Sequence, residues 1–281
     1  MESLVSTEWL SQHIDDPNLV LLDCTVTTIP HEDGGFHNVS GYPDYMAGHL
    51  PNAGFADLKG ELCDINSTVE FALPTPEQFC SAMGALGVAD DACVVLYDTN
   101  YTAWAARVWW MLRWVGFDGA AILDGGLGAW AAEGRPLSTE IVARSVKRLT
   151  PNPRPELIAD HDEVQASIDV AAVLIDTLPE AFYRGEISIY ERPGHIPGAM
   201  NIDALSLLDT TGRFRPEYEL AALHKDIKLD SRIITYCGGG IAASANAFIM
   251  TRLGFNNVAV YTDSLQVWAA DPSNPMVVGS E

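Results

Sequence analysis

The sequence has few basic residues, no long apolar run and no regular cysteine spacing. Only 16 Lys and Arg stand against 38 Asp and Glu, which gives a formal net charge of −22 over 281 residues. Such a surface repels phosphate backbones, so we expect no nucleic-acid partner. No apolar run reaches the roughly 18 residues that a membrane-spanning helix needs, so we expect no membrane partner. The acidic excess suits an ordinary acidic protein, which we favour, or a high-salt cytoplasm.

The five cysteines are odd in number and scattered, and none forms a CxxC pair. Their spacing fits neither a disulfide framework nor a zinc site, so we expect no metal and no other cofactor. The first residues, Met1–Ser6, lack the basic and apolar regions of a secretory signal. These features predict a protein of the reducing cytoplasm. Four cysteines are expected to be structural: Cys24, Cys63, Cys80 and Cys93.

What the chain does contain is an internal repeat with a period of about 140 residues. Gly48–Ala53 (GHLPNA) reappears as Gly194–Ala199 (GHIPGA). In each half an apolar run ending in Asp precedes this motif, and two more apolar runs with a helical stretch between them follow it. The apolar runs are Val20–Asp23, Val94–Tyr97, Ala120–Leu123, Val173–Asp176, Ile233–Tyr236 and Val258–Tyr261. Because the order is kept while loop lengths vary, tandem domains explain the repeat better than chance.

The apolar runs lack polar alternation, which is typical of strands buried on both faces. The helical stretches, Trp104–Phe117 and Ala242–Phe255, stand between two such strands and imply right-handed βαβ units. We therefore predict an α/β fold of two tandem domains, each a small, mainly parallel sheet flanked by helices. The predicted domains are residues 1–135 and 156–281, joined by a proline-rich linker at 136–155.

The sharpest chemical signal lies in the second half, where Cys237 directly follows an apolar strand. The free N–H groups of a helix N-terminus favour a thiolate, which is the nucleophilic form of cysteine. Glycines let the backbone curl into a nest of donors, which would hold the Cys237 sulfur or an anionic sulfur one atom beyond it. Five residues are expected to form this anion-binding loop: Gly238, Gly239, Gly240, Ile241 and Ala242.

Three other interpretations of this loop are weaker. A structural cysteine is less favoured because Cys237 stands at the carboxyl end of a strand, where α/β sheets place ligands. The pattern Gly238-x-Gly240-x-x-Ala243 also fits a dinucleotide fingerprint, but the 38 residues after Ala243 are too few for a complete domain of that kind. A cysteine phosphatase needs an Arg six residues after the Cys, and this chain has Ala243 there.

Motifs along most of the chain resemble those of the tandem-domain rhodaneses, the thiosulfate and 3-mercaptopyruvate sulfurtransferases. The resemblance runs from about Thr7 to Trp268. It rests on Gly48–Ala53, Arg107–Met111, Leu123–Leu127 with Trp130, Arg192–Ala199 and the strand–cysteine loop at 236–243. It implies a catalytically inactive first domain, and Asp98 stands where that domain would carry its cysteine.

The resemblance implies a sulfurtransferase that moves a sulfane sulfur through a persulfide on Cys237. Its donor would be a small anion, thiosulfate or 3-mercaptopyruvate, and its acceptor cyanide or a thiol, including that of a thioredoxin-like protein. Arg192 matches a family position that contacts substrate. Arg184 is a second candidate, because a guanidinium can bind such an anion through two hydrogen bonds. His49 and His195 are expected to fix the turns at their motifs.

The chain departs from the family at the positions that recognise the donor. Gly239 replaces the serine and Ala242 the threonine of a mercaptopyruvate-type loop. The aspartate and histidine that support this serine fall at Lys59 and Phe71, and a usual arginine falls at Phe182. The donor therefore stays open. So does the alternative of a non-catalytic persulfide carrier or interaction module that is loaded by a partner protein.

Overall fold

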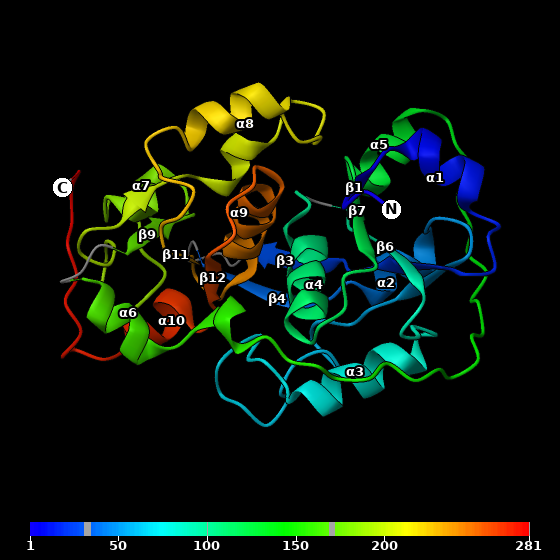
Figure 1. Ribbon diagram of the computed structural model, residues 1–281, viewed down its shortest axis with the longest axis horizontal. Coiled ribbons are helices and arrows are strands. Elements are labelled where there is room, and N and C mark those ends of the chain that lie inside the picture. The colour runs from blue at the N-terminus through cyan, green and yellow to red at the C-terminus, as the bar shows by residue number, and fades with distance from the viewer. Residues whose placement is uncertain (31–34, 100, 169–171, 281) are drawn as a thin grey trace. The chain divides into compact units, whose positions relative to one another are not determined.

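The computed structural model describes residues 1–30, 35–99, 101–168 and 172–280 (Figure 1). The chain forms two compact units, and each contains one five-stranded parallel sheet. This confirms the predicted tandem α/β architecture. The first unit comprises Met1–Asn66, Leu73–Arg154 and Thr210–Phe214, and the second comprises Ser67–Ala72, Pro155–Asp209 and Arg215–Glu281.

The two units differ from the predicted segments in three places. The stretch predicted as a linker packs on the first unit, where the Lys147 N–H donates to the Gly84 carbonyl at 2.9 Å. Ser67–Ala72 comes from the first half of the chain but belongs to the second unit, and Thr210–Phe214 is exchanged in the other direction. Composition does not reveal such short exchanged segments, because they carry no linker signal of their own.

The sheet of the first unit has the strand order β1-β7-β6-β2-β5, and all of its pairs are parallel. Its strands are β1 (Leu4–Val5), β2 (Leu19–Asp23), β5 (Ala53–Phe55), β6 (Cys93–Tyr97) and β7 (Ala120–Leu123). A separate antiparallel hairpin pairs β3 (Val26–Pro30) with β4 (Phe36–Ser40). The helices are α1 (Thr7–His13), α2 (Tyr42–Ala47), α3 (Pro76–Ala85), α4 (Ala103–Trp114) and α5 (Gly126–Ala132).

The second unit repeats this topology with the order β10-β9-β11-β12-β8. Its strands are β8 (Ile158–Ala159), β9 (Val173–Asp176), β10 (Met200–Asn201), β11 (Ile233–Tyr236) and β12 (Val258–Tyr261). Its helices are α6 (His161–Ser167), α7 (Glu180–Tyr183), α8 (Glu217–Leu223), α9 (Ile241–Arg252) and α10 (Ser264–Trp268), with 3₁₀ turns at Pro155–Leu157 and Ala204–Leu207. The central strand β11 is buried along its whole length, which explains its uninterrupted apolar sequence.

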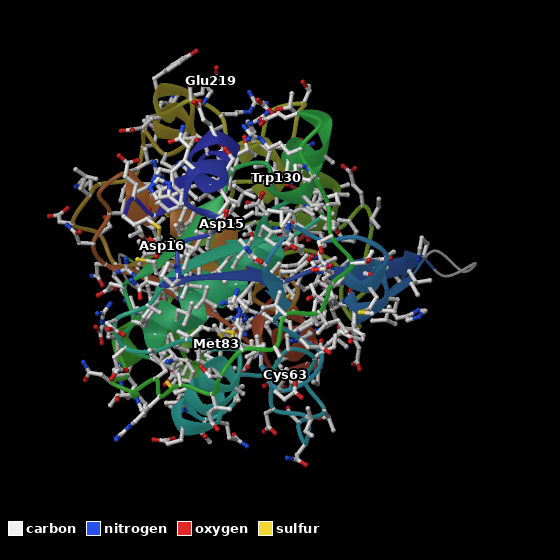
Figure 2. The ribbon with its side chains drawn as sticks, turned by 90° about the vertical axis from the view of Figure 1, so that its right-hand side faces the viewer. Asp15, Asp16, Cys63, Met83, Trp130 and Glu219 are labelled. Carbon is white, nitrogen blue, oxygen red and sulfur yellow. The ribbon has the colours of Figure 1, made fainter. Side chains whose placement is uncertain are left out.

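A buried tryptophan stands at the matching position of each unit and makes the same kind of hydrogen bond. Trp130 of α5, labelled in Figure 2, is buried and donates from Nε1 to the Pro136 carbonyl at 2.8 Å. Trp268 of α10 is also buried and donates to the Pro275 carbonyl at 3.0 Å. Each indole therefore ties the chain after the last helix of the repeat to its core. No helix in the described part of the chain is long and apolar enough to cross a membrane.

Candidate active site

Cys237 lies at the carboxyl end of β11, in the middle of the second parallel sheet. Its side chain is 2% exposed, and its sulfur accepts a hydrogen bond from the Gly240 N–H at 3.1 Å. Its own backbone N–H donates to Ser264 Oγ at 3.1 Å. The sulfur is therefore held at the start of α9 by a backbone donor.

The glycine loop leads directly into α9, a helix of 12 residues. Gly240 caps this helix with a left-handed φ of 79°, a conformation that glycine adopts without strain, and no side chain caps the first turn. The first N–H groups of a helix have no partner within it. The Gly240 N–H therefore reaches the sulfur directly, and Ile241 and Ala242 begin the helix whose positive dipole end lies beside it.

The start of α10 holds the other side of the same loop. The backbone N–H groups of Leu265 and Gln266 donate to the carbonyls of Cys237 and Gly238, both at 3.0 Å. Ser264 is fully buried with a φ of 52°, and its hydroxyl donates to the Tyr261 carbonyl at 2.7 Å. Because α10 binds these two carbonyls, the loop peptides are fixed in one orientation.

The first repeat holds a carboxylate in the corresponding place. Asp98 follows β6 as Cys237 follows β11, and its side chain is 2% exposed. Asp98 Oδ1 accepts the Thr102 N–H at 3.1 Å, and Oδ2 accepts the Ala105 N–H at 3.0 Å. The Leu127 N–H donates to the Asp98 carbonyl at 3.1 Å, as Leu265 does to Cys237. The N-terminus of α4 is thus a built anion site inside this same chain.

The two GHxPxA motifs are structural, as expected. The His195 Nδ1–H donates to the Tyr183 carbonyl at 2.7 Å, and the two rings stack with centroids 3.7 Å apart. His49 donates to Tyr45 at 2.7 Å with the same stacking at 3.9 Å. Both histidines are fully buried. Each therefore locks the turn that precedes a short strand of the sheet.

The matching strands β9 and β2 each end in a buried aspartate, Asp176 and Asp23. Burial raises the pKa of Asp176 to about 7, although hydrogen bonds from Leu178 and Tyr236 act in the other direction. Burial also raises the pKa of Asp23 to about 6. The Tyr236 hydroxyl in turn accepts the Ile196 N–H at 3.0 Å. These contacts connect the strand that carries Cys237 to the GHIPGA turn.

Arg192 uses most of its guanidinium on backbone carbonyls. Its Nε donates to Ala269 at 2.8 Å and its Nη1 to Asn274 at 2.7 Å. Its Nη2 donates to Trp268 at 3.0 Å and to Asp271 at 2.6 Å. Four of its five N–H donors thus hold the last residue of α10 and the chain that follows it. Its contact with substrate stays a prediction, whereas its position makes it an anchor of α10.

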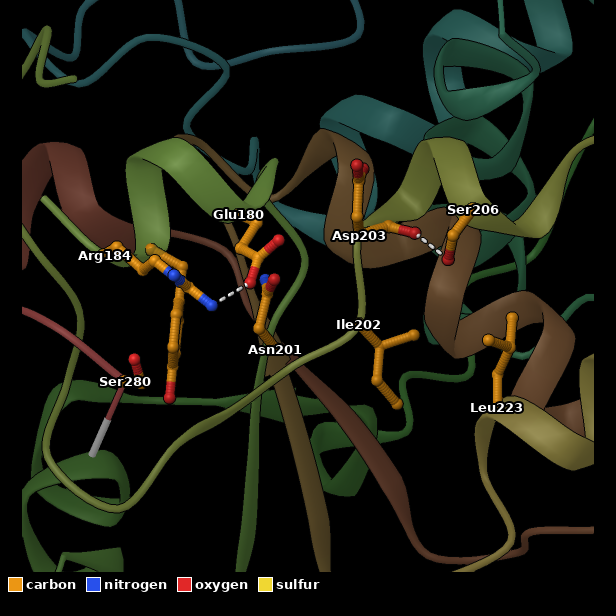
Figure 3. Close-up of a pocket in the computed structure, with 9 residues that line it drawn as sticks. Glu180, Arg184, Asn201, Ile202, Asp203, Ser206, Leu223 and Ser280 are labelled. Atoms are coloured by element: carbon orange, nitrogen blue, oxygen red, sulfur yellow. Dashed lines mark hydrogen bonds and ion pairs between the residues drawn. The ribbon is translucent and has the colours of Figure 1, made fainter. Parts of the chain in front are cut away.

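Arg184 lines a pocket on the second unit together with Asn201, Ile202 and Asp203 (Figure 3). Its guanidinium forms an ion pair with Glu180, one turn earlier on α7. Of the described residues that line this pocket, none belongs to the cysteine loop at 237–242. The substrate role of Arg184 stays a prediction, and the structure does not bring this residue together with the cysteine loop.

The remaining cysteines lie in the first unit, where Cys93 is exposed and the other three are in surroundings that disfavour a thiolate. Burial and the charges of Asp23 and Asp98 raise the pKa of Cys24 well above its usual range. Burial raises the pKa of Cys80 to about 11, and it also raises the pKa of Cys63, which is labelled in Figure 2. No group of metal-binding side chains occurs among the described residues.

Sequence reasoning missed three residues that surround the cysteine loop: Ser264, Gln266 and Tyr190. Gln266 donates from its side chain to the Glu70 carbonyl at 2.9 Å, within the second unit. The internal repeat could have pointed to Ser264, because Ser264 corresponds to Gly126 of the first repeat, whose φ is 53°. A glycine in one copy and a serine in the other marks an unusual backbone conformation.

Comparisons with known proteins extend over both repeats. A family model of the rhodanese-like domain matches residues 6–133 and again residues 160–271. The chain belongs to the rhodanese-like family. It is 33% identical to a probable 3-mercaptopyruvate sulfurtransferase of Pseudomonas aeruginosa over 98% of each chain. It is 32% identical to the 3-mercaptopyruvate sulfurtransferase of Escherichia coli K12, over 97% of this chain and 96% of that one.

The solved structures agree with this assignment. The crystal structure of SseA from Escherichia coli, described among the 3-mercaptopyruvate sulfotransferases, superposes with a TM-score of 0.83 at 31% identity. The match covers 94% of this chain and 99% of SseA. This rhodanese-like protein is therefore an enzyme of the sulfurtransferase class, as the sequence predicted.

Proposed function

We propose that this enzyme transfers a sulfane sulfur from a small anionic donor through a persulfide on Cys237. The observation that carries the proposal is the Asp98 carboxylate in the first repeat, which two backbone N–H groups hold at the start of α4. The second repeat replaces this fixed anion with Cys237, whose sulfur accepts the Gly240 N–H. A fold position that holds a carboxylate in one copy is suited to a thiolate or persulfide anion in the other.

The first half-reaction loads the enzyme. With thiosulfate, a bond forms between Cys237 Sγ and the outer sulfur, the sulfur–sulfur bond of thiosulfate breaks, and its electron pair leaves on sulfite. With 3-mercaptopyruvate, the carbon–sulfur bond breaks, and its electron pair leaves on the enolate of pyruvate. The thiol proton of the donor then ends on the enolate carbon. Either donor leaves Cys237 as a persulfide anion, so the transfer is split into two easier steps.

The second half-reaction returns the enzyme to the thiolate. Cyanide attacks the outer sulfur, takes it as thiocyanate and leaves the electron pair of the sulfur–sulfur bond on Cys237 Sγ. A thiolate acceptor, such as that of a thioredoxin-like protein, takes the same sulfur to become a persulfide. The backbone donors at Gly240–Ala242 act in both steps, because each step begins or ends with negative charge on sulfur.

We propose 3-mercaptopyruvate as the first donor to test, because the relatives with 32–33% identity carry that name. Thiosulfate is the second. The net charge of −22 supports an enzyme without a nucleic-acid partner, and the lack of a long apolar run supports the absence of a membrane partner. The scattered cysteines support a cytoplasmic location. Arg184 and Arg192 are retained as candidate contacts for the anionic part of the donor.

A second candidate function is a persulfide carrier that another protein loads. The placement of the two arginines favours it, because Arg192 is committed to backbone carbonyls and Arg184 is paired with Glu180. Arginines whose N–H donors are already engaged bind a small anion less tightly. Steady-state turnover with small donors separates the two functions, since a carrier shows none.

The test measures release of pyruvate or sulfite in the presence of cyanide. The matched variants are Cys237→Ser and Cys93→Ser, because Cys93 is an exposed cysteine of the first unit. We expect turnover with at least one donor, loss of all turnover in Cys237→Ser, and wild-type rates in Cys93→Ser. Turnover that survives in Cys237→Ser would contradict the proposed mechanism, and no turnover with either donor would favour the carrier.

A further inference from the structure

The three glycines of the cysteine loop are present for different reasons. Gly240 has a φ of 79°, whereas Gly238 and Gly239 are not among the described glycines with positive φ. Their missing side chains must therefore have another cause. A methyl group added at Gly238 would overlap the Tyr190 hydroxyl, and one added at Gly239 would lie 3.1 Å from Gln266 Nε2. The polar tips of two side chains thus take the space that side chains on the loop would fill.

Tyr190 contacts both its own segment and the core of the second unit. Its backbone N–H donates to Ser188 Oγ at 3.2 Å, and the Ser188 hydroxyl donates to the Tyr190 carbonyl at 3.0 Å. Its half-buried ring packs on the core of the second unit, in the cluster that includes Tyr236. The phenol oxygen reaches Gly238, the residue directly after Cys237, from the segment between α7 and the GHIPGA turn.

In the loading step, a hydroxyl beside the cysteine loop can stabilise the departing group. Either donor departs with new negative charge on oxygen: on sulfite after sulfur–sulfur cleavage, or on the enolate of pyruvate after carbon–sulfur cleavage. A positioned neutral donor stabilises such an oxyanion without bringing in a charge of its own. The second half-reaction with cyanide releases no oxyanion, so the same donor has no comparable role there.

We propose that Tyr190 is a catalytic residue whose O–H donates a hydrogen bond to the oxygen of the departing group while Cys237 takes the sulfur. This rests on the proposed function of Cys237. Tyr190 keeps its proton throughout, and the bonds that form and break are those of the loading step above. The arrangement also explains why residue 238 is glycine, because a methyl group there would overlap the Tyr190 hydroxyl.

Single-turnover kinetics test the role of the O–H group. Persulfide loading is followed by intact-protein mass with 3-mercaptopyruvate and with thiosulfate, and unloading is followed with cyanide. Hydrogen bonds to charged groups stabilise by about 1.5–3 kcal/mol, so we expect Tyr190→Phe to load roughly 10- to 100-fold more slowly. We expect it to unload at a rate within about twofold of the wild type. Tyr218→Phe, which changes an exposed tyrosine in α8, is the matched control and should leave both rates unchanged.

A second pair of variants tests the geometry. Gly238→Ala should lower the Tm, because its methyl group overlaps the Tyr190 hydroxyl. Adding Tyr190→Phe removes that oxygen and leaves the ring carbon Cζ 3.0 Å from the methyl position, so the double variant should recover part of the lost Tm. Tyr218→Phe should give no recovery.

The outcomes separate this inference from the proposed function. Loading of Tyr190→Phe at the wild-type rate, or equal slowing of loading and unloading, would overturn the role of Tyr190 and leave Cys237 in place. Absence of recovery in the double variant would overturn the contact itself. If the wild type cannot be loaded by either donor, the proposed function fails and the inference fails with it.

Discussion

Replacing Ser264 tests how α10 holds the cysteine loop. The buried Ser264 hydroxyl accepts the Cys237 N–H at 3.1 Å and donates to the Tyr261 carbonyl at 2.7 Å. Ser264→Ala removes both bonds and leaves a buried N–H without its partner, which costs about 2–3 kcal/mol in free energy of unfolding. Ser264→Gly also loses the bonds but relieves the left-handed φ of 52°. We therefore expect the glycine variant to be more stable than the alanine variant by about 1 kcal/mol.

Urea unfolding of the wild type and the two variants measures these differences. Ser273→Ala, which removes an exposed hydroxyl bonded to Asp271, serves as the control and should change the free energy of unfolding by less than about 0.5 kcal/mol. Both Ser264 variants should also load sulfur more slowly, because the backbone of Cys237 is no longer held. A glycine variant as unstable as the alanine variant, or an alanine variant as stable as the wild type, would refute this account of the loop.

Three further predictions concern the buried acid, the arginine anchor and the first repeat. The raised pKa of Asp176 means that the native state retains a proton that the unfolded chain releases above pH 4. The free energy of unfolding should therefore fall between pH 4 and pH 7. Asp176→Asn should reduce this fall by up to about 4 kcal/mol in urea titrations at several pH values; an unchanged pH dependence would show that Asp176 is ionised in the native state. Arg192→Lys should lose about 2 kcal/mol of stability, because one ammonium cannot reach four carbonyls; weaker donor binding at full stability would instead support a substrate contact. Asp98→Ala should lower the free energy of unfolding by about 1–2 kcal/mol, because the helix N–H groups at Thr102 and Ala105 lose their acceptor; an unchanged value would show that these bonds add nothing.

The architecture could be predicted from the sequence because the central strands are buried on both faces. Runs such as Ile233–Tyr236 contain no polar alternation, and the structure places them in the middle of their sheets. The predicted helices were too long at their C-termini. The chain leaves the helix before Gly116 and Gly254, where φ is 88° and 91°. Two-residue edge strands such as β8 and β10 are too short to show any periodicity.

The candidate site could be predicted only in part, because a sequence shows what a residue can bind but not which residues it contacts in the folded chain. Cys237 and its loop were recognisable, since strand, cysteine, glycines and helix are consecutive in the chain. The sequence allowed a substrate role for Arg192 because it does not show which backbone carbonyls accept from this side chain. In the structure these carbonyls lie 76 to 82 residues further along the chain. The approach of Tyr190 to Gly238 likewise depends on the tertiary fold.

The central claim is that Cys237 carries the transferred sulfur. Its most direct test is peptide mass spectrometry of the enzyme after brief exposure to 3-mercaptopyruvate or thiosulfate, with and without a following cyanide pulse. The account predicts one added sulfur atom on the peptide that contains Cys237, its loss after cyanide, and no added sulfur in Cys237→Ser. Added sulfur on another cysteine, or loading that persists in Cys237→Ser, would contradict it.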